Sequence, residues 1–231
     1  MMRIYYARTD LFLEESIRQK QIHLLCRQRR DKILRCKNSN DSARSMTAGF
    51  LLRHALLEEG LYYDKLDFVT TKHGKIEIQN YDNYHVNLTH AGGYAACVVA
   101  DQQVGIDIED SKRFEIDGPK ASERIFRIAK HSCTAEEMKH LENAEEEKLC
   151  KCFTQIWTRK ESYSKAKGLG MQIGFSTINT LEEGYYWEHI IDDRYWLSVA
   201  TFKKEEAVTI CDCTEQLKMI KIGDLDTCMM N

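Results

Sequence analysis

Residues 94–109 read YAACVVADQQVGIDIE, and this stretch decides the fold class. Residues 94–100 are a continuous apolar run, 101–103 are turn-forming, and 104–109 alternate apolar with polar or small residues, as strands do. Just upstream, residues 86–89 also alternate and end before the glycine pair at 92–93. We therefore expect an antiparallel meander of three strands.

Helical patterns precede this meander, and the same order then recurs. Helices are expected over residues 11–37, 42–59, 122–131, 134–148 and 150–167, and a second meander over 185–191, 195–202 and 207–211. Helices followed by a meander, twice, predict an α+β protein with two similar halves. We place the N-terminal half at residues 1–103 and the C-terminal half, with the carboxylate motifs described below, at residues 104–231.

Composition excludes several classes of protein. A chain of 231 residues with 43% hydrophobic and 30% charged residues and a net charge of −3 is typical of a soluble domain, with no nucleic-acid or membrane partner. The stretch 27–37 is strongly basic, although a solvated helix face would look the same. No run is apolar enough to span a membrane, and no N-terminal export signal is visible, so we expect a cytoplasmic protein.

The cysteines are expected to be reduced thiols. There are nine, an odd number, and no sign of export. Cys150-Lys-Cys152 and Cys211-Asp-Cys213 have gaps shorter than those of structural zinc sites, so we do not expect zinc there.

Asp107 and Glu109 form the first candidate site. On a strand, residues two apart point to the same face, so these carboxylates project together while Ile106 and Ile108 face the core. A divalent cation such as Mg²⁺ or Mn²⁺ would relieve their repulsion. The alternative is an edge strand with acidic residues in water.

A second candidate segment is WTRKESYSK, residues 157–165. On a helix Trp157, Glu161 and Lys165 share one face, which would place a carboxylate and an ammonium where a metal-bound diphosphate needs them. An exposed helix ion pair is the alternative.

A third segment, NLTHAGG at 87–93, ends a strand in glycines whose backbone N–H groups can approach an anion. His90 could donate to phosphate or be a structural histidine. Arg44 and the Gly74-Lys75 turn supply further cations.

The order and spacing of these motifs resemble the Sfp-type 4′-phosphopantetheinyl transferases. The resemblance covers about residues 44–170: a Thr-His-x-Gly turn, an Asp-x-Glu strand about 17 residues later, and a Trp-x-x-Lys-Glu-x-x-x-Lys helix about 50 residues beyond. Residues 128–130 and 134–137 resemble the family's segment between the metal motifs. The resemblance implies a pseudo-dimer of two α+β halves that binds coenzyme A in the cleft between them.

The resemblance also implies roles for individual residues. Asp107, Glu109 and Glu161 would bind Mg²⁺, with Mn²⁺ as the alternative, and Asp107, Glu161 and Lys165 would form the catalytic set. Glu161 is the candidate base. The residues implied in binding coenzyme A, the substrate, are Lys32, Arg44, Gly74, Lys75, Thr89, His90 and Lys165.

The implied reaction moves the 4′-phosphopantetheine group from coenzyme A to a serine of an apo acyl or peptidyl carrier protein and releases adenosine 3′,5′-bisphosphate. Such carriers serve nonribosomal peptide, polyketide or fatty-acid synthesis, and the length of the chain resembles that of the monomeric members. Two alternatives stay open: another Mg²⁺-dependent enzyme acting on a diphosphate, and a non-catalytic sensor of coenzyme A or a nucleotide.

Three positions depart from the family's pattern. Ile76 stands where Gly-Lys is often followed by proline, Thr89 replaces a serine, and Cys133 replaces an aromatic residue. None of the three is an implied metal ligand.

Overall fold

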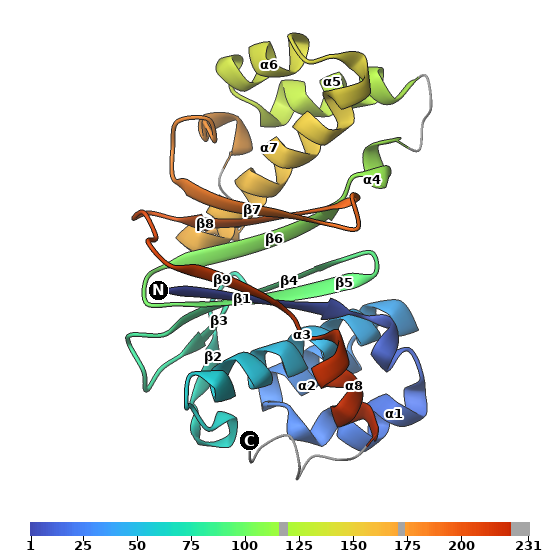
Figure 1. The fold of residues 1–231 in the computed structure, drawn as a ribbon, viewed down its shortest axis with the longest axis vertical. Coiled ribbons are helices and arrows are strands. Elements are labelled where there is room, and N and C mark those ends of the chain that lie inside the picture. The colour runs from blue at the N-terminus through green and yellow to red at the C-terminus, as the bar shows by residue number, and fades with distance from the viewer. Residues whose placement is uncertain (116–119, 171–173, 223–231) are drawn as a thin grey trace. The chain divides into compact units, whose positions relative to one another are not determined.

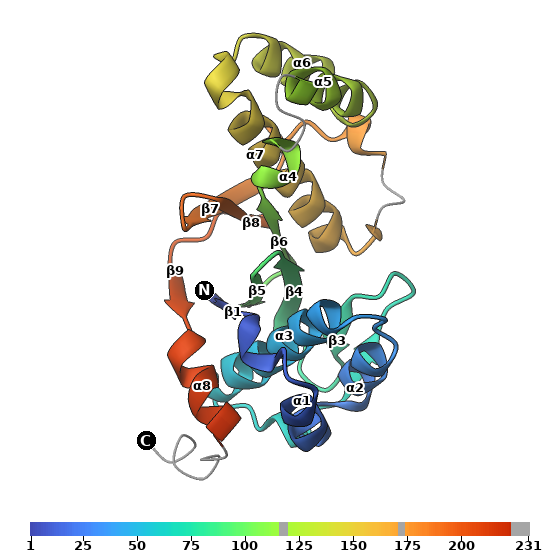
Figure 2. The same cartoon turned by 90° about the vertical axis from the view of Figure 1, so that its right-hand side faces the viewer.

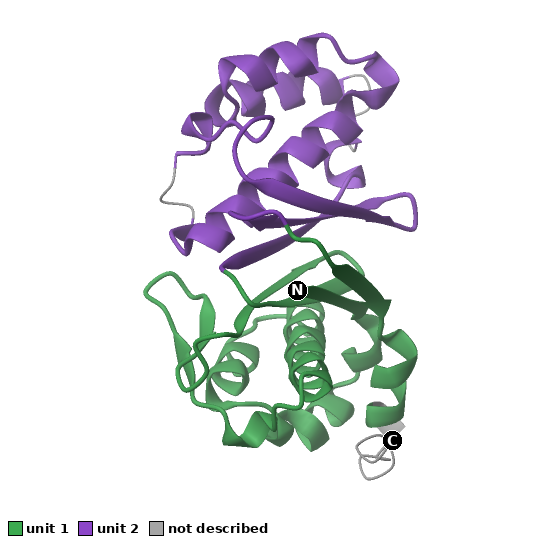
Figure 3. Cartoon of the chain, turned by 60° about the vertical axis from the view of Figure 1, so that its left-hand side comes forward, with its two compact units in different colours: residues 1–102, 205–231 green, residues 103–204 purple. Residues whose placement is uncertain are grey.

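The computed structural model describes residues 1–115, 120–170 and 174–222. The chain forms two compact units, each described here by itself (Figure 3). Unit 1 contains residues 1–102 together with the chain from residue 205 onward, and unit 2 contains residues 103–204. Among the described residues, no helix has the length and apolar character needed to cross a membrane.

Unit 1 is built on a four-stranded sheet in the order β4-β5-β1-β9. The strands are β1 (Met2–Arg8), β4 (His85–Ala91), β5 (Tyr94–Ala100) and β9 (Val208–Asp212). β5 pairs antiparallel with both β4 and β1, while β9 pairs parallel with β1. All seven residues of β5 are buried, which explains why its sequence is a continuous apolar run rather than an alternating one. A small hairpin of β2 (Phe68–Thr70) and β3 (Ile76–Ile78) stands beside β4.

The long helix α3 (Ser39–Glu58) covers β5 and β4 in unit 1 (Figure 1). Asn38 caps its start by accepting a hydrogen bond from the Asp41 backbone N–H at 2.8 Å. After the helix, Gly60 takes a left-handed conformation, φ +74°, as expected for a helix C-terminus. The predicted helix at 42–59 is therefore confirmed and begins three residues earlier.

The helix predicted over residues 11–37 is divided into shorter pieces. These are η1 (Asp10–Phe12), α1 (Glu15–Gln21), η2 (Ile22–Leu24) and α2 (Arg27–Leu34). The chain is extended at Leu25, whose side chain packs so closely on Gly49 of α3 that a Cβ there would lie 2.8 Å from it. The extended residue Leu25 separates η2 from α2. A further short helix, η3 (Tyr63–Lys65), follows α3, and α8 (Thr214–Ile222) follows β9.

Unit 2 places helices against a three-stranded antiparallel sheet in the order β6-β8-β7. The strands are β6 (Val104–Asp110), β7 (Tyr185–Ile191) and β8 (Tyr195–Thr201). Helix α7 (Glu146–Lys167) lies across β6 and β8 and ends at Gly168, φ 69° (Figure 2). α4 (Lys112–Glu115), α5 (Ala121–Ser132) and α6 (Ala135–Glu142) pack on α7, and η6 (Phe175–Thr177) contacts α5. The helix predicted at 134–148 is thus two elements, α6 and the start of α7.

The α+β class is confirmed, but both predicted meanders were wrong in their third strand. β6 follows β5 in sequence yet pairs with β8, and β9 follows β8 yet pairs with β1. β5 cannot accept β6 because its two edges already pair with β4 and β1. Because β9 pairs with β1, residues 205–222 group with unit 1 and not with the half predicted at 104–231. The approximate two-fold relation between the halves stays a prediction.

Candidate active site

Strand β6 carries the first two carboxylates of the site. Ile106 and Ile108 are buried, and β6 pairs in register with β8 along its length. Asp107 is 5% exposed. The side chain of Glu109 is 14% exposed, so neither carboxylate lies on an open edge in water. The expectation of exposed acidic residues is therefore the weaker of the two sequence interpretations.

Gly105 brings helix α7 unusually close to β6. A Cβ at this position would lie 2.1 Å from Ser162 O and 2.3 Å from Ala166 N, both backbone atoms of α7. Any side chain here would therefore force the helix away from the strand. Because Ser162 and Ala166 flank Lys165 in the helix, this close approach also brings Lys165 next to Asp107.

Of the carboxylates of Asp107, Glu109 and Glu161, the first two form ion pairs. Lys165 Nζ lies 2.5 Å from Asp107 Oδ1, which joins the α7 motif directly to the β6 motif. Glu109 accepts hydrogen bonds from Arg113 Nη1 at 3.0 and 3.2 Å. The sequence interpretation did not single out Arg113, although its position four residues after Glu109 could have signalled the pair.

The electrostatics of Glu161 connect it to the same cluster. Burial, followed by the negative charge of Asp107, raises the pKa of Glu161 to about 7; Lys165 opposes this rise and Glu109 contributes to it. Burial and Asp107 also raise the pKa of Glu109. Glu161 therefore lies within electrostatic reach of Asp107, Glu109 and Lys165, and the role of these four residues in a common site stays a prediction.

The cluster suits a hard divalent cation by its chemistry. Burial, followed by the charge of Asp107, raises the pKa of Glu109 and of Glu161, so a positive ion would stabilise their charged forms, and carboxylate oxygens are ligands that Mg²⁺ prefers. In the part of the chain that the structure describes, no three His, Cys, Asp or Glu side chains form an arrangement that could hold a metal ion. Lys165 and Arg113 balance the carboxylates instead, so cation binding would have to displace or share these pairs.

In unit 1, the structure brings Arg44 to the turn between β4 and β5. Arg44 Nε donates to Gly92 O at 2.9 Å, and its Nη1 pairs with Asp41 at the same distance. Thr89 and His90 lie at the end of β4, directly before this turn. Arg44 and the Thr-His motif therefore share one end of the sheet, as a phosphate site would require.

The other cations predicted to bind coenzyme A lie elsewhere in unit 1. Gly74 has φ +85° in the β2–β3 turn. The charge of Lys75 acts on His85 at the beginning of β4, whereas His90 is near the strand's end. Burial lowers the pKa of Lys75. Lys32 is exposed on α2, which packs against α3, the helix of Arg44.

One member of the basic stretch 27–37 does not belong to a solvated face. Arg29 is only 5% exposed, and its Nη2 donates to Ser45 O at 2.6 Å and to Ser45 Oγ at 3.1 Å. It fastens α2 to α3, a role that a run of basic letters could not reveal. The described cysteines are free thiols, as expected.

Comparison with known proteins agrees with this geometry. Residues 103–211 match the family model of the 4′-phosphopantetheinyl transferase superfamily, a span that contains both β6 and α7. Together with relatives that carry the same description over most of their length, this match confirms the resemblance seen in the sequence. Residues 103–211 thus match the 4′-phosphopantetheinyl transferase superfamily, and this match together with the relatives indicates an enzyme of that class.

Three relatives from Bacillus illustrate the similarity. The 4′-phosphopantetheinyl transferase psf-1 of Bacillus pumilus is 27% identical over 191 residues, 81% of this chain and 78% of the relative. A 4′-phosphopantetheinyl transferase of Bacillus subtilis is 24% identical over 215 residues, 92% of each chain. The 4′-phosphopantetheinyl transferase Sfp of Bacillus subtilis strain 168 is 26% identical over 180 residues, 77% of this chain and 75% of the relative.

Proposed function

We propose that this chain transfers the 4′-phosphopantetheine group of coenzyme A to a serine of an apo acyl or peptidyl carrier protein. The observation that carries the proposal is the contact between Lys165 and Asp107, with Glu161 and Glu109 coupled to it. It joins two sequence motifs that are 58 residues apart into one charged site on β6 and α7. The family and the names of the relatives support the class of reaction.

The proposal includes a divalent cation, Mg²⁺ or, as the alternative, Mn²⁺. Asp107, Glu109 and Glu161 would hold it, because they supply carboxylate oxygens, and burial followed by the charge of Asp107 raises the pKa of Glu109 and of Glu161. When bound, the ion supplies neutralisation of the charge that develops on the diphosphate.

The residues of the chain have separate roles in the transfer. The serine oxygen forms a bond to the β-phosphorus, and the bond from that phosphorus to the departing adenosine 3′,5′-bisphosphate breaks. Lys165 donates to the diphosphate and stabilises its negative charge. Glu161 is the proposed base that takes the proton of the serine hydroxyl, because its carboxylate belongs to the same charged cluster as Asp107 and Lys165.

Unit 1 supplies the residues proposed to bind the nucleotide part of coenzyme A. Arg44 and His90, at the β4–β5 end of the sheet, are proposed to bind its 3′-phosphate, and Thr89 and the turn at Gly74-Lys75 to contact the phosphate or the adenine. Lys32 would assist from α2. We further propose that the enzyme acts as a monomer and has no nucleic-acid or membrane partner.

The test is to incubate the purified protein with coenzyme A, MgCl₂ and a panel of apo carrier proteins, then weigh each carrier. The expected result is one added phosphopantetheinyl group on a carrier serine, lost when EDTA is present. Cleavage of coenzyme A without a carrier would instead support a hydrolytic enzyme. Coenzyme A binding that is independent of Mg²⁺, with no transfer to any carrier, would support a sensor.

A further inference from the structure

A second charged pair lies on α7, immediately before Glu161 in sequence, and is entirely buried. Lys160 Nζ and Glu137 Oε2 are 2.6 Å apart, and both side chains are 0% exposed. The sequence interpretation used Lys160 only as part of a motif and assigned Glu137 no role. A buried pair of this kind is costly to desolvate unless further hydrogen bonds satisfy both groups.

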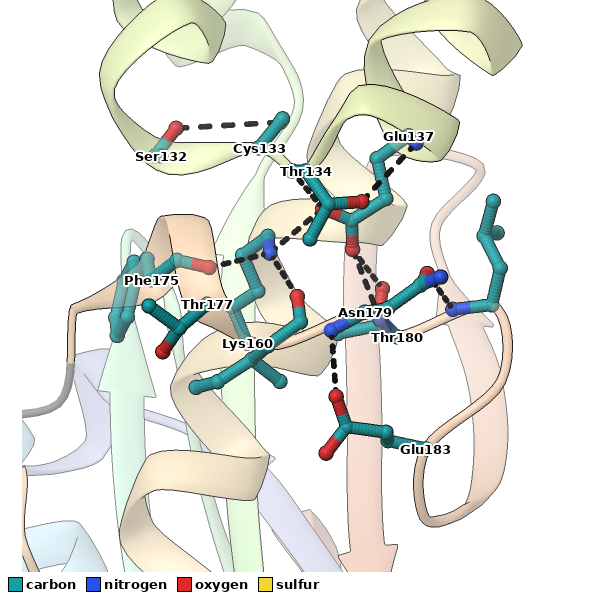
Figure 4. Close-up of polar contacts among 12 residues, drawn as sticks. Ser132, Cys133, Thr134, Glu137, Lys160, Phe175, Thr177, Asn179, Thr180 and Glu183 are labelled. Carbon is teal, nitrogen blue, oxygen red and sulfur yellow. Dashed lines mark hydrogen bonds and ion pairs between the residues drawn. The ribbon is translucent and has the colours of Figure 1, made fainter.

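Glu137 is satisfied by α6 and by the chain that follows η6. It accepts from the backbone N–H of Thr134 at 2.9 Å, which forms the capping box at the start of α6. Its other oxygen accepts from Thr180 N at 2.9 Å and Thr180 Oγ1 at 2.7 Å. Figure 4 shows these bonds meeting at one carboxylate.

Lys160 is satisfied by the same neighbourhood. Besides Glu137, its Nζ donates to the carbonyl oxygens of Phe175 at 2.7 Å and Ile178 at 2.5 Å (Figure 4). The pair therefore fastens three segments to one point: the start of α6, the middle of α7, and residues 175–180. These segments are distant in sequence, and the pair gives them one shared fixed contact.

The position of this contact on α7 matters for the candidate site. Consecutive residues on a helix point about 100° apart, so fixing Lys160 also fixes the direction in which Glu161 projects. The preceding residue, Arg159, makes two bonds to Glu188 of β7, at 2.9 and 2.7 Å. Two consecutive residues just before Glu161 thus bind α7 to different segments, and a small rotation of the helix would move Glu161 and Lys165 away from Asp107.

We propose that Lys160 and Glu137 are positioning residues: their buried pair sets the rotation of α7 so that Glu161 and Lys165 face Asp107. Neither touches the reacting groups in this proposal. It rests on the proposed function in so far as the site binds Mg²⁺ and transfers phosphopantetheine. Partners that hydrogen-bond directly to metal ligands typically change metal affinity by about 10- to 100-fold, and this more distant pair should act near the lower end of that range.

The test separates positioning from stability with two kinds of variant. Lys160→Met leaves the Glu137 carboxylate buried without its cation and should lower the urea midpoint strongly. The double variant Lys160→Met/Glu137→Leu removes both charges and should recover much of the midpoint, but it cannot restore the bonds to Thr134, Thr180, Phe175 and Ile178. Ile125→Ala, in the buried core of α5, serves as a matched control that lowers stability without touching the pair.

Two readouts are measured on variants that are folded in the absence of urea. Calorimetry with MgCl₂ should show an affinity at least about tenfold weaker in the double variant and unchanged in Ile125→Ala. A double-mutant cycle of Lys165→Met and Asp107→Asn, read from urea midpoints, should show coupling in the wild type and in Ile125→Ala but not in the Lys160→Met/Glu137→Leu background. Thr180→Val, the mildest change, should show a smaller loss of Mg²⁺ affinity and a smaller loss of the coupling between Lys165 and Asp107.

The proposal is overturned if the double variant binds Mg²⁺ like the wild type and keeps the Lys165–Asp107 coupling. If the double variant does not fold, Thr180→Val decides by the same two readouts, and no loss in either overturns the proposal. A wild type that neither binds Mg²⁺ nor modifies a carrier contradicts the proposed function instead. The coupling cycle uses no metal and no substrate, so it still decides the positioning role.

Discussion

A single methyl group added at Gly105 should reduce both stability and activity. In Gly105→Ala the new Cβ would lie 2.1 Å from Ser162 O, whereas ordinary van der Waals contact begins at 3.4 Å. α7 would therefore have to retreat from β6 by about 1.3 Å, since the opposing atoms are backbone and cannot rotate away. Overpacking of this kind costs about 1–3 kcal/mol or more, and backbone against backbone favours the upper end.

The same retreat would disturb the site. It would lengthen the contact between Lys165 and Asp107, which is now 2.5 Å. A displacement of about 1 Å can reduce turnover by about 100-fold when reacting groups must be aligned. We therefore expect Gly105→Ala to lose about 3 kcal/mol of unfolding free energy and to transfer phosphopantetheine about 100-fold more slowly.

Urea unfolding and the rate of carrier modification measure the two effects. Gly174→Ala is the matched control in the same unit, because the nearest atom to its added Cβ is Thr177 Cγ2 at 3.9 Å and its φ of −63° suits alanine. It should match the wild type in both assays. If Gly105→Ala is as stable and as active as Gly174→Ala, the close approach of α7 to β6 is not what sets the site.

Three further changes test the charges around the site. Without metal, the pKa of Glu161 is about 7 in the folded protein and about 4.5 in the unfolded chain, so ionisation of this group lowers the stability of the wild type as pH rises from about 4.5 to about 7. Glu161→Gln should therefore become more stable relative to the wild type across that pH range, and a difference in urea midpoint that stays constant with pH would contradict this. Arg113→Gln should strengthen Mg²⁺ binding severalfold at most, because Mg²⁺ no longer competes with the Arg113–Glu109 ion pair, which is worth about 0.2–1 kcal/mol. Weaker Mg²⁺ binding by calorimetry would show instead that Arg113 assists the site. Arg159→Met should lower the free energy of unfolding by about 1–3 kcal/mol, because Glu188 is left half-buried without its cation. An unchanged urea midpoint would show that the Arg159–Glu188 pair is not needed to hold α7.

Local pattern was enough to find strands β4 to β9 and the facing carboxylates. The alternation in 104–109 predicted that Asp107 and Glu109 share a face, and helical spacing placed Glu161 with Lys165. Both depend only on the geometry of one element. The family resemblance then joined the two motifs, which no local pattern could do.

Pairing between distant segments was beyond local pattern. The parallel pairing of β9 with β1 and the departure of β6 from β5 depend on which sheet edges are already occupied. β1 itself was not predicted, since the sequence MRIYYAR has no clear alternation. Lys160 and Glu137 look like surface charges on two helices, and only the packing of α6, α7 and residues 175–180 makes them a buried pair.

The central claim is that Asp107 belongs to the site that transfers phosphopantetheine. The most direct measurement is the initial rate of carrier mass gain, with adenosine 3′,5′-bisphosphate quantified in the same quenched samples, for the wild type, Asp107→Asn and Asp110→Asn. Asp110 is the matched control because it lies on the same strand but pairs with Arg194, its Oδ1 accepting from Arg194 Nε at 2.7 Å. The account predicts equal amounts of the two products, a rate at least about 100-fold lower for Asp107→Asn, and a rate within severalfold of the wild type for Asp110→Asn. Equal rates for the two variants would contradict it.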